Sequence, residues 1–173
     1  MTKTDKILRF LREIDIPYEL TRIKGKTFLP ALKFNNGVLL IDQEKLIYPG
    51  DILHEAGHFA VCEPVFRHLL DSDVYKNGLR IGREAQAMHG EEMAATAWAV
   101  AAATYLSLPL ETIFHEDSYK GANNHLKSIF ENNSGFGYPL LQAWQMTCPN
   151  EGYPKMTKWI RELRWIEALP IRE

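Results

Sequence analysis

The chain opens with hydrophobic and polar residues that alternate at a helical spacing. Ile7, Leu11 and Ile14 are apolar, basic residues stand between them, and Pro17 follows. An apolar residue at every third or fourth position lines one face of a helix. The pattern therefore predicts an amphipathic helix over residues 4–15, ended by the proline.

The pattern then changes to short apolar runs separated by turn residues, which is typical of strands. Four runs are predicted as strands, at residues 18–23, 28–34, 38–41 and 46–48. The pair Asn36-Gly37 lies between the second and third runs and favours a two-residue hairpin turn. We therefore expect a small, mostly antiparallel sheet.

Helical patterns dominate the remainder of the chain. Asp51, after Pro49 and Gly50, is predicted to cap a helix from Ile52 to about Cys62. Residues 71–83 are mostly polar and include two glycines, so they are predicted to form a loop. A second long helix is predicted from Arg83 or Glu91 to Leu106, with shorter helical segments at residues 110–116, 122–131, 139–146 and 155–167. This order predicts a single α+β domain over residues 1–173.

Composition narrows the class of partner. The chain is 46% hydrophobic and 24% charged, which is ordinary for a globular protein, and its net charge is -2. We expect no nucleic-acid ligand, because no basic patch is present. The uncharged run from Met93 to Leu110 is interrupted by polar residues and by Pro109, so it predicts a buried helix and no membrane span.

Cysteine content and the first residues bear on the compartment. Cys62 and Cys148 are far apart and follow no disulfide or metal-binding spacing. The first twelve residues mix charges with apolar positions, unlike the unbroken apolar core of a secretion signal. We therefore expect a cytoplasmic protein. The sequence leaves the oligomeric state open.

Residues 54–58 carry the chemistry, since they read H-E-x-x-H. On a helix, His54 and His58 lie on one face about a turn apart and can both bind Zn²⁺, with Glu55 beside them as a general base. A catalytic zinc takes three protein ligands and leaves the fourth position to water. The third ligand is open from the residues alone, and the candidates are His68, Asp71, Asp73, His89, Glu91 and Glu92.

A glutamate on a second helix packed across the first has the best mechanical support among these candidates. Ala95, Ala99 and Ala102 follow Glu92 at helical spacing, and this stripe of small residues would allow a close approach of the two helices. Two other zinc classes are disfavoured. The extended histidine motif of metzincins is missing after His58, and no cysteine precedes the motif as it does in peptide deformylases.

The H-E-x-x-H run and residues 92–99, which read E-M-A-A-T-A-W-A, together resemble the gluzincin metallopeptidases, and among them the small IrrE/ImmA-like zincins of bacteria. In that family a small sheet precedes the motif helix, and the glutamate ligand on the following helix starts a pattern similar to E-x-x-A-N-x-F-A. Here Thr96 stands in the asparagine place and Trp98 in the phenylalanine place. The resemblance covers about residues 38–106. It implies a zincin-like fold, and its register implies Glu92 as the third ligand.

The predicted activity is that of a zinc metallopeptidase acting on a peptide or protein substrate. Zinc-activated water would attack the peptide carbonyl, and Glu55 would take the proton and pass it to the leaving amine. A second donor to the developing oxyanion is expected, with His89, His115, Tyr119, Tyr138 and Tyr153 as candidates. The alternatives are a zinc hydrolase of a non-peptide amide, a non-catalytic binding or regulatory protein, and an accidental motif.

Overall fold

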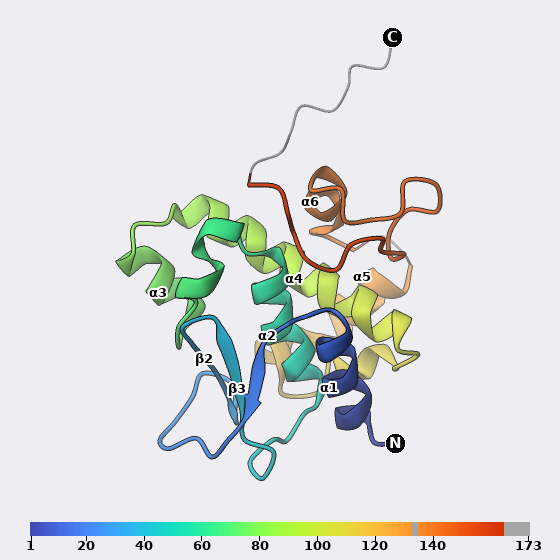
Figure 1. Cartoon of the computed structure of the whole chain (residues 1–173). Helices are drawn as coiled ribbons and strands as arrows, with labels where there is room; N and C mark the ends of the chain where they lie inside the picture. Colours follow the sequence, from blue (N-terminus) through green and yellow to red (C-terminus); the bar gives the residue numbers. More distant parts are fainter. Residues whose placement is uncertain (133–134, 165–173) are drawn as a thin grey trace.

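A small sheet lies beside a set of helices in the computed structural model, which describes residues 1–132 and 135–164 (Figure 1). The predicted α+β class is therefore confirmed. The sheet has three strands, β1 (Tyr18–Leu20), β2 (Leu32–Asn35) and β3 (Val38–Ile41), in the order β1-β3-β2.

The β2–β3 hairpin forms at the predicted turn. Asn36 and Gly37 have φ values of 47° and 79°, the left-handed conformation that two-residue hairpin turns require. The sheet as a whole is mixed, however, because β1 pairs with β3 in parallel while β2 pairs with β3 antiparallel. The expectation of a mostly antiparallel sheet was wrong. Residues 21–31 form a long connection, so that β1 pairs with β3 in parallel and does not pair with β2.

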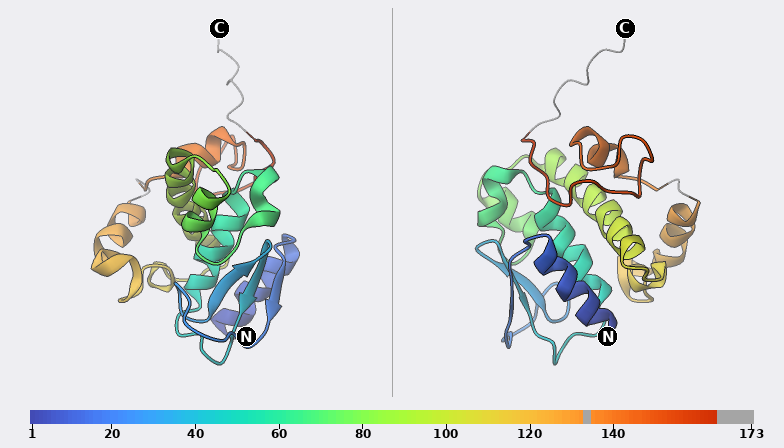
Figure 2. Two further views of the ribbon diagram at one scale, coloured as in Figure 1. Left: turned by 90° about the vertical axis from the view of Figure 1, so that its left-hand side faces the viewer. Right: turned by 45° about the vertical axis from the view of Figure 1, so that its right-hand side comes forward.

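Residues 46–48, predicted as a fourth strand, form no strand. Tyr48 instead stacks its ring on His115, with 3.7 Å between ring centroids. Tyr48 thus packs against a side chain from later in the sequence, while Ile47 is exposed. Helix α1 (Lys3–Glu13) does form over the predicted stretch and lies alongside α2 (Figure 2).

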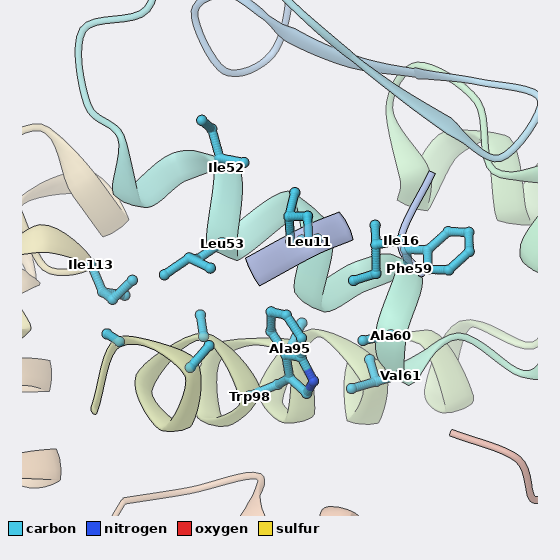
Figure 3. Packing of buried hydrophobic residues seen from close by; sticks show 14 of the residues in the cluster. Leu11, Ile16, Ile52, Leu53, Phe59, Ala60, Val61, Ala95, Trp98 and Ile113 are labelled. Carbon is cyan, nitrogen blue, oxygen red and sulfur yellow. The ribbon is translucent and has the colours of Figure 1, made fainter. Parts of the chain in front are cut away.

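Two long helices, α2 (Gly50–Val61) and α4 (Ala85–Tyr105), form the centre of the core. Figure 3 shows Leu53 and Val61 of α2 lying near Ala95 and Trp98 of α4. The helices approach closely at Gly57, where a Cβ atom would lie 2.8 Å from the backbone oxygen of Ala95. A residue of the predicted alanine stripe therefore faces the glycine inside the H-E-x-x-H run.

The start of α2 differs from the prediction. The helix begins at Gly50, Pro49 takes the cap position, and no side chain caps it. The carboxylate of Asp51 is instead 2.7 Å from Nε2 of His115, in a pair whose side chains are both buried. Asp51 does not cap the helix, because this buried pairing takes its side chain. Gly50 cannot be replaced, since a Cβ atom there would overlap the backbone oxygen of Thr112.

The chain between α2 and α4 is also more ordered than expected. It contains the 3₁₀ helix η1 (Pro64–Leu69). The helix α3 (Val74–Arg80) then forms within residues 71–83, where the sequence predicted a loop. Asp73 caps α3 by accepting the N–H of Lys76 at 3.0 Å. Gly78 belongs to the packing of α3, because a Cβ atom there would collide with the sulfur of Met88 on α4.

Short helices follow α4. These are η2 (Leu110–Thr112), η3 (Ser118–Gly121), α5 (Asn123–Glu131) and α6 (Tyr138–Ala143), so three of the four predicted segments are helical in part. In the fourth, residues 155–164 are not helical, and residues 165–167 lie outside the described residues.

Residues 155–164 cross over α4 (Figure 1). Their backbone is hydrogen-bonded to both long helices, α2 and α4. The indole of Trp98 donates to the carbonyl of Trp159 at 2.9 Å, and the N–H of Arg161 donates to the carbonyl of Ala60 at 2.9 Å. An extended backbone can offer these groups outward, whereas a helix would use them internally. Within the described part of the chain, no helix combines the length and apolarity needed to cross a bilayer.

Candidate metal centre

The two histidines of the H-E-x-x-H run lie in the middle of α2 and converge on one point. Their spacing of four residues puts both imidazoles on the same face. The Nε2 atoms of His54 and His58 are 3.3 Å apart, with the rings nearly perpendicular at 86°. One donor atom from each of His54, Glu55 and His58 fits within a span of 4.8 Å. Such a group has the size of a metal site.

Helix α4 brings Glu92 to the same point. One carboxylate oxygen of Glu92 is 3.0 Å from Nε2 of His58, and the other is 3.5 Å from Nε2 of His54. A tetrahedral zinc with bonds of about 2.0–2.1 Å has its ligand atoms about 3.3–3.4 Å apart. The three donor separations bracket this value, so the residues present fit a zinc ion.

Glu91 has a different environment although it is the neighbouring residue. Its carboxylate is 2.6 Å from the guanidinium of Arg83 and 3.2 Å from that of Arg161, and it accepts the backbone N–H of Glu63. All three charged side chains are less than a tenth exposed. Glu91 therefore neutralises two buried cations and points away from the histidines.

The other candidates for the third ligand lie elsewhere or serve other contacts. Asp73 lines the same small cavity as the histidines, but its side chain caps α3. The ring of His89 stacks on Tyr75, at 5.3 Å between centroids. His68 and Asp71 do not line the cavity. The geometry thus places Glu92, among the six candidates, against both imidazoles.

The charges of the group are strongly coupled. Burial opposes the protonation of His58, but the carboxylates of Glu92 and Glu55 outweigh it and raise the pKa of His58 to about 9. Burial alone would raise the pKa of Glu92, but the positive charge of His58 outweighs it, so the pKa of Glu92 falls to about 2. Burial and the charge of His58 lower the pKa of His54 to about 4. The protein without metal therefore holds an ion pair where the ligands converge.

Glu55 is 7% exposed, and burial raises its pKa to about 7. It lines a cavity of about 90 Å³ together with His54, His58 and Glu92. Tyr75 of α3 lines the same cavity, and the sequence analysis missed this residue because it predicted a loop there. The signal that could have found it is the cap residue Asp73 just ahead of an apolar pair.

The five candidates for a second oxyanion donor are not among the residues that line this cavity. Tyr153 donates to the carbonyl of Ala97 at 2.8 Å, and Tyr138 stacks on the Tyr153 ring. His115 is paired with Asp51. Tyr119 lies behind His54, with its hydroxyl 3.2 Å from Nδ1. Tyr75 is thus the tyrosine that lines the small cavity, whereas His115 and Tyr119 line a larger cleft beside it.

A larger cleft of about 570 Å³ shares His54 and Glu92 with the small cavity. Its other walls are largely apolar and include Phe28, Leu29, Ile47, Ile113 and Leu126. Phe28 is 80% exposed and Ile47 is 62% exposed, although both are large apolar side chains. Exposed apolar groups gathered at one cleft are typical of a surface that binds a ligand.

Comparison with known proteins adds no family to this geometry. Protein-family models, curated proteins and solved structures were all searched, and none matches the chain. The residues of the site therefore carry the evidence for a function.

Proposed function

We propose that this chain is a zinc-dependent metallopeptidase of the gluzincin type, with a zincin-like arrangement of its two central helices. The observation that carries the proposal is the position of Glu92, whose two oxygens lie 3.0 and 3.5 Å from the Nε2 atoms of His58 and His54. A chance H-E-x-x-H run would not require a carboxylate from another helix at that point. The proposed zinc ligands are His54, His58 and Glu92.

Bound zinc would supply Lewis acidity and lower the pKa of a water molecule toward about 7. Glu55 would accept the proton of that water, because its carboxylate lines the cavity onto which the ligands converge. It would then deliver the proton to the leaving amine. Tyr75 would donate a hydrogen bond to the carbonyl oxygen as negative charge develops on it.

The substrate in this proposal is a peptide or protein with a large apolar side chain near the scissile bond. The cleft beside His54 and Glu92 supports this, because its walls offer apolar surface within reach of the reacting carbonyl. A cytoplasmic location is also part of the proposal, and the two free cysteines, Cys62 and Cys148, are in keeping with a reducing compartment.

Glu55→Gln tests the proposal, since it removes the base and leaves the three ligands in place. We expect the zinc-loaded variant to lose cleavage of fluorogenic peptides by at least about 100-fold, the lower range for general-base catalysis, with zinc content unchanged. Glu84→Gln is a suitable control, because Glu84 is exposed and its side chain caps nothing. Full activity of a folded Glu55→Gln variant would contradict the mechanism.

A panel of small amides assayed beside the peptides separates a peptidase from a hydrolase of non-peptide amides. Zinc binding without turnover of either class, and without any effect of Glu55→Gln, would instead indicate a binding protein with the same centre.

A further inference from the structure

The hydroxyl of Tyr119 lies directly behind one of the proposed zinc ligands. It is 3.2 Å from Nδ1 of His54, the ring nitrogen that faces away from Glu92 and His58. The Tyr119 ring is held from its other side by Phe114, at 5.5 Å between centroids. Ring packing and the hydroxyl contact together fix where the oxygen sits.

The hydroxyl continues into a chain of hydrogen bonds that ends on α4. Tyr119 donates to the Thr96 hydroxyl at 3.4 Å, and Thr96 donates to the backbone carbonyl of Glu92 at 3.2 Å. With those two donors assigned, the Tyr119 oxygen has a lone pair free to accept from an Nδ1–H of His54. That tautomer leaves Nε2 unprotonated and able to bind a metal.

We propose that Tyr119, acting with Thr96, is a positioning residue that fixes the ring orientation and the metal-binding tautomer of His54. The inference rests on the metal centre of the proposed function and is independent of whether peptides are cleaved. The partner of a ligating imidazole usually tunes metal affinity in this way. Here the chain also links the His54 ring to the backbone of Glu92, so that two ligands from different helices are set relative to one another.

The backbone that presents Tyr119 supports a specific role. Tyr119 and Lys120 both adopt left-handed conformations, with φ values of 51° and 54°, and Gly121 continues the turn at 88°. Residues with a side chain rarely adopt this conformation in succession, and such strained segments cluster at functional sites. This turn presents the Tyr119 ring to both Phe114 and His54.

Thr96 connects Tyr119 to the helix that carries Glu92. Its hydroxyl donates to the backbone carbonyl of Glu92, one turn earlier on α4. In this chain the Thr96 hydroxyl contacts Tyr119, which spans the remaining distance to His54. Tyr119 and Thr96 thus form one continuous path from His54 to the backbone of Glu92.

Tyr119→Phe tests the inference, because it removes the hydroxyl and keeps the ring against Phe114. Dissociation constants for Zn²⁺ and Co²⁺ should be measured by competition with a chromophoric chelator, and the visible spectrum of the Co²⁺ form should be recorded. We expect metal affinity to fall about 10–100-fold, the usual effect of losing the partner of a ligating histidine, and the Co²⁺ bands to shift. Thr96→Val should lower affinity in the same direction, whereas Thr96→Ser should retain it.

Tyr153→Phe is the matched control, because Tyr153 also bonds α4 through its hydroxyl but contacts Ala97 and not a ligand. It should leave metal affinity and the Co²⁺ spectrum unchanged even if the melting temperature falls. Metal affinity of Tyr119→Phe within twofold of wild type, or an equal loss in Tyr153→Phe, would overturn the assignment. A wild-type chain that binds neither metal would refute the metal centre itself, whereas tight binding without peptidase activity would leave this inference standing.

Discussion

Substitution by alanine should mainly lower the stability of the fold at Glu91 and mainly lower the affinity for zinc at Glu92. Glu91→Ala leaves Arg83 and Arg161 without their counter-charge, and these side chains are only 4% and 5% exposed. Removing one partner of a buried ion pair costs about 3–5 kcal/mol. For a chain of this size, each kcal/mol corresponds to about 2–4 °C in melting temperature. We therefore expect Glu91→Ala to melt about 10 °C lower, with the zinc ligands still in place.

Glu92→Ala should destabilise the metal-free protein less than Glu91→Ala does, because the Glu92 side chain is 52% exposed and its partner His58, unlike an arginine, can release its proton once the carboxylate is lost. Its effect on zinc should be large. Losing the hydrogen-bond partner of a metal ligand usually weakens metal binding by up to about 100-fold. Loss of a ligand itself should therefore weaken zinc binding by more than about 100-fold. Thermal unfolding in excess chelator reports the first quantity, and zinc competition at a temperature where both variants are folded reports the second. Zinc affinity lost in Glu91→Ala and kept in Glu92→Ala would refute the ligand assignment.

Three further predictions follow from the packing, the cleft and a buried acid. Gly57→Ala should destabilise the fold by about 1–3 kcal/mol in chemical denaturation, despite the better helix propensity of alanine, because its Cβ would lie 2.8 Å from the Ala95 oxygen; unchanged stability would show that the helices can move apart. Ala122→Phe should fill the apolar cleft and raise KM for peptides with a central phenylalanine about 10-fold. It should not alter zinc affinity, and Ser128→Phe on α5, which begins directly after Ala122 and whose residue 128 lies outside the cleft lining, should change neither quantity. Asp42 is 2% exposed, and the N–H of Ile23 lowers its pKa. Its contribution is therefore complete above about pH 4 and is lost as the pH falls through the lowered pKa; the melting-temperature gap between wild type and Asp42→Asn should shrink below pH 4, and a constant gap would contradict this.

The local patterns of the sequence predicted most of the elements around the site. The Asn36-Gly37 turn formed as expected because its left-handed backbone is set by two residues alone. The placement of His54 and His58 on one helix face also follows from spacing alone. These features depend on neighbours in sequence, which is why they could be predicted.

Features that depend on distant residues could not be predicted in the same way. The register of the resemblance implied Glu92, but the residues alone left Glu91 open, and one of the contacts that occupy Glu91 comes from Arg161, 70 positions away. Asp51 has the sequence of a helix cap, yet His115 takes its carboxylate. Helix α3 was missed because Gly78 and Gly82 suggested a loop over residues 71–83, whereas Gly78 lies within the helix and leaves room for the Met88 side chain. In each case a tertiary contact outweighs the local preference.

The contacts of Arg161 also have a consequence for the order of assembly during synthesis. Both ligand-bearing helices are complete by residue 105, but Glu91 meets Arg161 and Ala60 receives its backbone hydrogen bond only after residue 161 has left the ribosome. At about 5–20 residues per second, several seconds separate these events. During that interval Glu91 of α4 is paired with Arg83 alone, and residues 155–164 do not yet contact α2 and α4. A nascent chain stalled before residue 155 should therefore be more sensitive to protease than the released protein.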